Sequence, residues 1–225
     1  MKFAHHYQTS SARNCAHRPV RPTSITMFRQ LGLYIKPDFL PREECRHILA
    51  EMAMSVNTSA GVMRRGRSMI NEHIRKTRMA FVSEETSQQI MDRLLTMRKR
   101  LQRHFGVHTH RCCEPQFLMY KRGAFFRPHP DNDRDRRQPK AVLGRQLSAV
   151  IFLNGNDTGR VRLGSRSFGG GLLVFHRLPE HPTAETYRLG LVPSCGLLVV
   201  FPSGIWHEVT PVTWGTRCSI VSWFY

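Results

Sequence analysis

The chain has 225 residues, a hydrophobic content of 40% and a formal net charge of +18, from 34 basic and 16 acidic residues. This length suits one domain with a well-buried core, and no apolar run approaches the ~20 residues that a membrane-spanning helix needs. The six cysteines include no Cys-x-x-Cys pair. This pattern favours a reducing, intracellular compartment over a disulfide-rich secreted fold, and we expect a cytoplasmic protein.

The excess of positive charge favours anionic partners such as nucleic acid or the ribosome, or a small anionic cosubstrate. A compositional preference for arginine explains the same excess. Basic residues gather at 64–67, 75–78 and 98–103, and clusters of this kind are usually solvated surface.

The first 28 residues are basic and contain no acidic residue. We expect a flexible basic tail at 1–28, followed by one domain at 29–225. The composition of the tail also resembles a mitochondrial targeting segment, and a start at Met27 is a further alternative.

In chain order, a short strand is expected at 33–35 and a helix after Pro41, because apolar residues then recur at helical spacing. Residues 61–78 indicate loop or irregular strand. Helix-start residues at 83–87 open a second helix, which Gly106 ends. One face of this helix is apolar, formed by Ile90, Leu94, Met97, Leu101 and Phe105.

From Pro115 onward the pattern changes to short β-rich runs, separated by turn residues at 154–155, 193–194 and 214–215. The polar segment 131–140 predicts a mobile loop. Two helices followed by many short strands predict a mostly β fold with supporting helices, a double-stranded β-helix (jelly roll, cupin-like). The expected strands are 116–121, 147–153, 172–176, 186–191, 197–201, 207–213 and 218–224.

One set of histidine and aspartate residues has a spacing that indicates a metal-binding site. His129-Pro130-Asp131 is followed 76 residues after Asp131 by His207, and ten residues later by Arg217. Residues i and i+2 of an extended segment project to the same side, so His129 and Asp131 can share an ion with a histidine from a distant strand. Two imidazoles and a carboxylate can hold Fe(II) on one face and leave other positions open.

Alternatives stand beside this interpretation. Asp133 also has even spacing from His129. Arg217 offers a planar charged fork suited to a carboxylate. It could instead face a buried acid, and Lys121, Arg122 or Arg127 would then be the cation that binds an anionic ligand. A zinc site at 104–112 is not expected, because the His and Cys spacings there match no standard pattern.

The ordered motifs strengthen the first reading: Y-x-x-G from Tyr120, F-x-x-H-x-D, L-N at 153–154, G-G at 170–171, H-x-V-x-P-V from His207, and G-x-R ending at Arg217. In this order they resemble the Fe(II)/2-oxoglutarate-dependent dioxygenases, most of all the prolyl 4-hydroxylase-like branch. The resemblance covers residues 35–225 and is firmest from 115. One departure is Leu172, where relatives often have an acidic residue.

The resemblance implies that His129, Asp131 and His207 are the iron ligands, that Arg217 binds the distal carboxylate of 2-oxoglutarate, and that Tyr120 donates a hydrogen bond to the same molecule. Fe(II) would be the cofactor, 2-oxoglutarate and O2 the cosubstrates, and ascorbate the reductant. In such an enzyme the iron performs the difficult chemistry while the protein orients the reactants.

The expected reaction is therefore hydroxylation of an unactivated C–H bond, with a prolyl residue in a protein or peptide as the leading substrate. His176 and Trp206 are candidates for a substrate pocket. A free amino acid or small metabolite is the alternative substrate, and a nucleic-acid demethylase is less expected because Trp223 replaces that branch's second arginine. A non-enzymatic basic nucleic-acid-binding module is the alternative of another class. The sequence indicates no oligomeric state.

Overall fold

The computed structural model describes residues 31–64, 67–132, 138–155, 167–176 and 188–225. The expected tail at 1–28 lies outside these residues, as does the middle of the polar segment 131–140. The described chain forms three helices: α2 (Arg42–Met54), α3 (Glu84–Phe105) and the short α4 (Lys140–Leu143).

Strands make up most of the rest. They are β1 (Tyr34–Lys36), β2 (Asn57–Ser59), β3 (Val62–Arg64), β4 (Arg67–Met69), β5 (Arg75–Lys76), β6 (Arg78–Ala80), β7 (Gln116–Lys121), β8 (Phe125–His129), β9 (Leu147–Phe152), β10 (Phe168–Gly170), β11 (Leu173–His176), β12 (Arg188–Leu191), β13 (Leu198–Pro202), β14 (Trp206–Val209) and β15 (Val212–Phe224).

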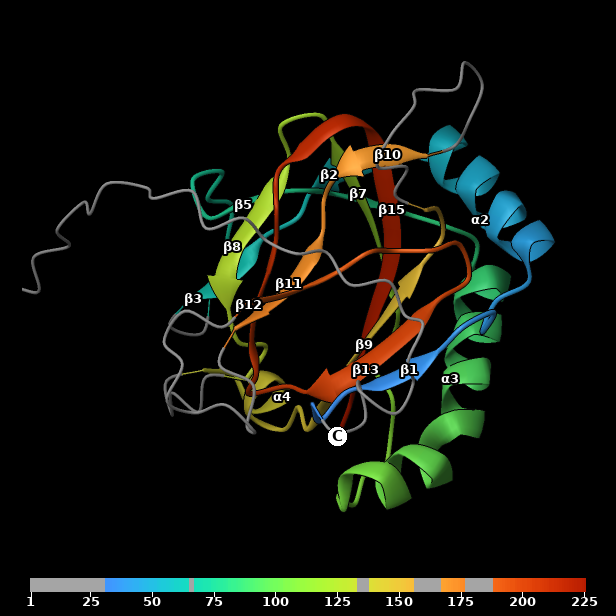
Figure 1. Ribbon diagram of the computed structural model, residues 1–225, viewed down its shortest axis with the longest axis vertical. Coiled ribbons are helices and arrows are strands. Elements are labelled where there is room, and N and C mark those ends of the chain that lie inside the picture. The colour runs from blue at the N-terminus through green and yellow to red at the C-terminus, as the bar shows by residue number, and fades with distance from the viewer. Residues whose placement is uncertain (1–30, 65–66, 133–137, 156–166, 177–187) are drawn as a thin grey trace, which may run out of the picture.

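The strands build two antiparallel sheets. The major sheet has the order β1-β13-β9-β15-β7-β6-β2, with β10 pairing β15, and the minor sheet has the order β12-β11-β14-β8-β5. A separate pair joins β3 to β4. In Figure 1 the two long helices lie on one side of the major sheet, and the minor sheet lies on the other. This is the expected jelly roll backed by helices, and the predicted fold class is confirmed.

Alternation along the central strands produces these layers. In β9, Ala149 and Ile151 belong to the apolar cluster that includes the buried faces of α2 and α3. Val150 and Phe152 point the other way, into the cluster between the two sheets. All six residues of β9 are buried, because the strand is covered on both faces. Such a strand has no polar face and shows no alternation of polar and apolar residues.

The second helix follows its sequence signals. The hydroxyl of Ser83 accepts a hydrogen bond from the backbone N–H of Thr86 at 3.2 Å, which caps the helix start. Gly106 ends the helix with a φ of 65°, a left-handed conformation in which glycine has no Cβ penalty. The predicted apolar face is buried from Ile90 to Leu101.

Several sequence predictions were wrong in detail. Residues 207–213 do not form one strand: β14 ends at Val209 and β15 begins at Val212, because Pro211 between them has no N–H for a ladder. Trp214-Gly215 is not a turn but lies inside β15. Gly215 has a φ of 72° and pairs with Phe168 of the neighbouring strand β10. The strands β8 and β10 and the helix α4 were not predicted.

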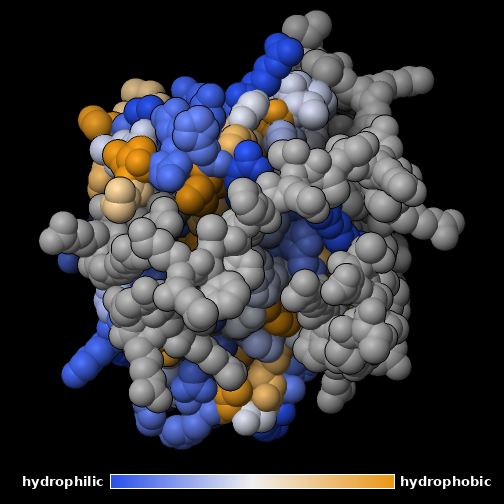
Figure 2. Space-filling model, turned by 90° about the vertical axis from the view of Figure 1, so that its left-hand side faces the viewer, coloured by the Kyte–Doolittle hydropathy of each residue, from blue (hydrophilic) through white to orange (hydrophobic). Residues whose placement is uncertain are grey.

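The surface matches the charged composition. Figure 2 shows mainly hydrophilic described residues on the face in view, with apolar residues in separate patches. No helix within the described ranges is long and apolar enough to cross a bilayer. Among the residues that the structure describes, the exposed large apolar side chains are Met54, Val56, Met69, Ile70, Phe81 and Trp206.

Candidate metal centre

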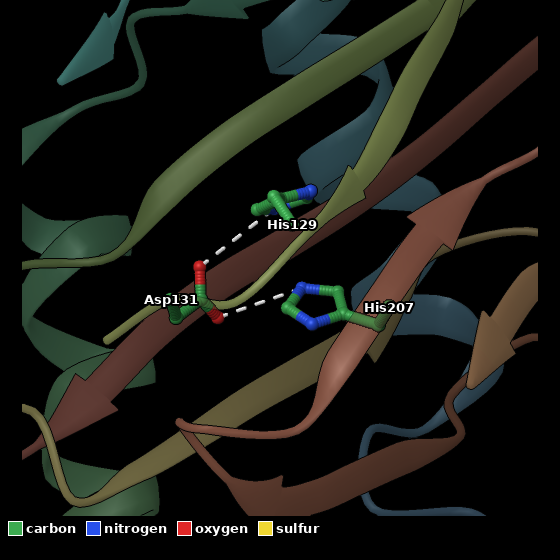
Figure 3. Close-up of side chains that lie close together, drawn as sticks. All are labelled: His129, Asp131 and His207. Atoms are coloured by element: carbon green, nitrogen blue, oxygen red, sulfur yellow. Dashed lines mark ion pairs between the residues drawn. The ribbon is translucent and has the colours of Figure 1, made fainter. Parts of the chain in front are cut away.

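The minor sheet brings the three predicted ligands together. His129 is the last residue of β8, and the β8–β14 ladder pairs it directly with His207. Asp131 follows two residues later. Its Oδ1 lies 3.9 Å from Nε2 of His129, and its Oδ2 lies 3.6 Å from Nε2 of His207. Figure 3 shows the carboxylate facing both imidazoles, and one ligand atom from each residue lies within 4.8 Å of the others.

Backbone carbonyls set the protonation of both rings. Nδ1 of His129 lies 2.7 Å from the carbonyl oxygen of Arg127, and Nδ1 of His207 lies 2.9 Å from that of Ile205. A carbonyl oxygen can only accept, so each Nδ1 donates its proton. Each neutral ring then keeps the lone pair of Nε2 for the shared centre, an arrangement typical of metal-binding histidines.

The electrostatics favour a neutral imidazole beside a carboxylate. Although 19% of the His129 side chain is exposed, its enclosure in the site, followed by the proximity of His207, lowers its pKa to about 3. Burial opposes ionisation of Asp131, but His207 and His129 together hold the pKa of its carboxyl below the usual value. Two imidazole nitrogens and a carboxylate oxygen form a donor set that fits Fe(II).

Neighbouring side chains hold this arrangement in place. The ring of Phe126 stacks on His129 with centroids 3.5 Å apart, and Phe201 meets His207 edge-on at 4.8 Å. The hydroxyl of Ser148 and the indole N–H of Trp223 also favour the ionised Asp131. The indole nitrogen has no hydrogen bond of normal geometry, so we attribute its effect to proximity.

Arg217 lies in the same cavity, on β15 of the major sheet. Its side chain is only 1% exposed, and its guanidinium carbon lies 4.9 Å from the ring centroid of Tyr120 and 5.0 Å from that of Phe152. Its Nη1 donates to the hydroxyl of Ser219 at 2.9 Å, whereas its Nε is buried without a partner. Burial lowers the pKa of Arg217.

No carboxylate of the described residues forms an ion pair with Arg217. The alternative of a buried acid partner is therefore not found in that part of the chain. Lys121, Arg122 and Arg127, the other candidate cations, do not line the cavity that contains Arg217. A buried guanidinium with an unused N–H suits a carboxylate that arrives with a ligand.

The cavity has a volume of about 400 Å³ and lies between the two sheets, within the usual range for small-molecule sites. Strand alternation decides which residues line it. Arg217, Ser219, Val221 and Trp223 face it from β15, while Cys218, Ile220 and Phe224 face the helices. The same alternation brings Tyr120 into the cavity from β7.

The two residues suggested for a substrate pocket lie elsewhere. His176 and Trp206 pair across the β11–β14 ladder, but neither lines the cavity. Trp206 precedes His207 in the same strand, so alternation turns it outward, and 49% of it is exposed. His176 instead lies 3.3 Å from the carboxylate of Glu208. A substrate role for either residue stays a prediction.

Sequence reasoning missed two cavity arginines. Arg75 was grouped with an exposed basic cluster, yet it lines the cavity beside Phe126. Arg145 also lines it, with its guanidinium carbon 3.7 Å from the ring centroid of Trp223. Strand alternation from Arg217 along β15 would have predicted that Trp223 faces the cavity. No comparable local pattern in the sequence marks Arg75 or Arg145.

Comparison with known proteins agrees with this geometry. The profile of the 2OG-Fe(II) oxygenase superfamily matches residues 115–225. A PKHD-type hydroxylase of Shewanella baltica is 28% identical over 192 residues, covering 83% of this chain and 75% of the relative. Prolyl 3-hydroxylase 1 of Gallus gallus is 36% identical over 90 residues, which are 39% of this chain and 10% of the relative.

Solved structures share the fold. The crystal structure of a Pseudomonas putida prolyl-4-hydroxylase has a TM-score of 0.62 at 24% identity, covering 89% of this chain and 95% of the other. A Trichoplax adhaerens prolyl hydroxylase in complex with a hypoxia inducible factor peptide fragment has a TM-score of 0.67 at 19% identity, covering 89% and 86%. The fold, the three converging side chains and the matching profile lead to one conclusion: residues 115–225 match the 2OG-Fe(II) oxygenase superfamily, and the protein is an oxidoreductase of the dioxygenase type.

Proposed function

We propose that the protein hydroxylates an unactivated C–H bond of a prolyl residue in a protein or peptide. The observation that carries this is the convergence of His129, Asp131 and His207 beside a buried arginine in one cavity. The family implies Fe(II) and 2-oxoglutarate with O2. The similarity of this chain to hydroxylases of prolyl residues supports the substrate class.

In this proposal, Nε2 of His129, Nε2 of His207 and the carboxylate of Asp131 hold the iron, and Arg217 binds the distal carboxylate of 2-oxoglutarate. When bound, iron supplies the oxidative chemistry that couples decarboxylation of 2-oxoglutarate to hydroxylation. The protein's residues orient the reactants. The two Nδ1–H donors keep the rings directed at the metal, and Tyr120, buried beside Arg217, donates to the cosubstrate.

The apolar lining of the cavity has a role in the same mechanism. Phe126, Val150, Leu173 and Val209 surround the polar groups and limit the access of water. In such surroundings, each charged contact with the cosubstrate is stronger than in bulk water. Ascorbate would serve as the external reductant that keeps the iron ferrous between turnovers.

Two measurements test the proposal. Under anaerobic conditions, Fe(II) with 2-oxoglutarate should give a weak visible charge-transfer band, which His129→Ala abolishes. The matched control is His108→Ala, because His108 is exposed and does not line the cavity. Retention of the full band in His129→Ala would refute the assignment of this ligand.

The substrate is tested by mass spectrometry of prolyl peptides. A product heavier by one oxygen atom should form only with 2-oxoglutarate, and ascorbate should increase the number of turnovers. Hydroxylation of free proline but of no peptide would favour the small-metabolite alternative. The relatives named above are hydroxylases, so a non-enzymatic nucleic-acid-binding module has no support from them.

A further inference from the structure

The cavity holds more positive charge than 2-oxoglutarate needs. Its described lining contains three arginines, Arg75, Arg145 and Arg217, against one carboxylate, that of Asp131. Iron and the 2-oxoglutarate dianion would carry equal and opposite charges, so their arrival leaves the excess in place. If Arg217 binds the cosubstrate, Arg75 and Arg145 still face the cavity without an anion.

Arg75 stands on the His129 side of the site. Its guanidinium carbon lies 4.8 Å from the ring centroid of Phe126, the ring that stacks on His129. One nitrogen, Nη1, donates to the carbonyl oxygen of Gly61 at 2.9 Å. Its Nε is buried and has no hydrogen-bond partner.

Arg145 stands on the Asp131 side. Its guanidinium carbon lies over the ring of Trp223, 3.7 Å from the ring centroid. A long contact of 3.4 Å joins Nη1 to the backbone carbonyl of Asp131. The Nε of Arg145 is also buried without a partner, and no ion pair within the described residues includes Arg145 or Arg75.

Both side chains are partly buried, but the Nε–H donor of each is buried without a partner, which is unfavourable unless an acceptor arrives. The planar fork of arginine matches a carboxylate, and a charged hydrogen bond in an enclosed site is among the stronger ones. Aromatic rings under both guanidinium groups, Phe126 and Trp223, hold them in place. Both cations are thus pre-oriented on the two sides of the triad.

We propose that Arg75 and Arg145 form a carboxylate-binding subsite, and that the substrate carries a carboxylate next to its reacting residue. With the proposed prolyl hydroxylation, on which this inference rests, the substrate class is an acidic prolyl peptide. The carboxylate comes either from a neighbouring Asp or Glu side chain or from the α-carboxylate of a terminal proline. The two sources share one chemistry and are separated below.

The experiment compares prolyl peptides that differ only beside the proline: Glu, Gln or Lys at the flanking positions. A second pair ends in proline, either with a free carboxylate or with an amide. The ratio kcat/KM is measured from the hydroxylated product, and succinate formation is measured in parallel. The Glu peptide should exceed the Gln peptide by about tenfold or more. Preference for the free terminal carboxylate over the amide would assign the other source.

Variants then locate the subsite. Arg145→Gln and Arg75→Gln should each lower kcat/KM for the preferred acidic peptide by about ten- to a hundredfold while changing the Gln peptide little. Damage to the iron site through the Asp131 backbone would lower kcat/KM equally for both peptides. The ratio of the two kcat/KM values therefore isolates the effect of the peptide's charge. Arg122→Gln is the matched control, because Arg122 is exposed and does not line the cavity.

The outcomes separate this inference from the proposed function. Equal turnover of Glu, Gln and amide-ended prolyl peptides keeps the function and overturns the subsite, as does a charge preference that survives both arginine substitutions. Succinate formation driven by acidic peptides that lack proline keeps the subsite and overturns the prolyl assignment. The comparison of peptides uses the unaltered chain, so it decides the question even where a variant does not fold.

Discussion

Replacing Arg217 by methionine should leave the ligand-free protein as stable or more stable, and should remove most of the stabilisation that 2-oxoglutarate provides. The side chain is 1% exposed, has no carboxylate partner in the described part of the chain, and has a pKa lowered by burial. Methionine reaches about as far as the Nε atom of arginine, so the space of the guanidinium group joins the cavity, and it needs no counterion. Replacing buried charges by apolar side chains is often neutral or stabilising by roughly 1–4 kcal/mol.

Two effects set the magnitude in the ligand-free state. Removal of the unpaired charge is favourable, whereas loss of the 2.9 Å bond from Arg217 leaves the Ser219 hydroxyl without its donor, which costs about 1 kcal/mol. We therefore expect a net change between zero and about +3 kcal/mol in the free energy of unfolding. For a chain of this length, 1 kcal/mol corresponds to about 2–4 °C in Tm.

The ligand-bound state should behave in the opposite way. At 2-oxoglutarate one hundred times above Kd, the original chain gains about 2.7 kcal/mol. Loss of the charged contact, in Arg217→Ala as in Arg217→Met, weakens binding by about 1.5–3 kcal/mol, roughly ten- to a hundredfold. The same ligand concentration then stabilises the variant by only about 0.4–1.4 kcal/mol.

The assay is thermal unfolding with and without 2-oxoglutarate, at constant Mn(II) in place of oxidisable Fe(II), together with calorimetric Kd values. Arg122→Met is the control for the substitution itself, because Arg122 is exposed. An undiminished 2-oxoglutarate shift in Arg217→Met would mean that another cation binds the distal carboxylate. A loss of several kcal/mol in the ligand-free variant would instead show that Arg217 is a structural residue.

Three further predictions concern single residues. Glu51→Gln should lower stability by about 0.5–1 kcal/mol after solvent screening, because the carboxylate accepts hydrogen bonds at the start of α3. Partial burial opposes ionisation of Glu51, but these bonds hold its pKa below the usual value, so its contribution is present above the ordinary carboxyl pKa and disappears as acid titration passes the folded value. A hydrogen bond from the neighbouring Cys45 thiol lowers the pKa of Cys195 to about 7, whereas burial raises that of Cys218 to about 12. Iodoacetamide should therefore modify Cys195 before Cys218, as peptide mass spectrometry would show. Gly171→Ala should destabilise the fold by about 1–2 kcal/mol and weaken 2-oxoglutarate binding in calorimetry, because φ is +56° and the new Cβ would lie 3.0 Å from the Arg217 side chain.

The sequence predicted best where the structure depends on local signals. The helix α3 has a capping residue, an apolar stripe and a terminal glycine, and the structure follows all three. The strand β7 matches its predicted range because apolar residues fill it on both faces. The convergence of the triad was also predictable. His129 and Asp131 point the same way in an extended segment, and pairing of β14 with β8 in a single register places His207 opposite His129.

Prediction failed where long-range pairing decides. The strand β8 contains Pro128 and no buried residue, so it lacks the pattern of a strand and depends on its neighbours β5 and β14. The position of Arg75 depends on its register with Phe126 across β5 and β8. A basic cluster in the sequence therefore divides into a cavity residue and surface residues only after the sheet has formed.

The distribution of unused polar atoms separates ligand recognition from accident. Buried polar groups normally find partners, and exceptions tend to mark functional sites. The Nε atoms of Arg75, Arg145 and Arg217 are all buried without partners, and all three side chains line the cavity that contains the triad. Three arginines with an unpartnered Nε around one cavity are difficult to explain as defects of packing, because an apolar residue could replace any of them at little cost. They are explained if their partners are anions that enter and leave with each turnover. The ligand-free protein then carries unpartnered donors that the cosubstrate and an acidic substrate satisfy in turn.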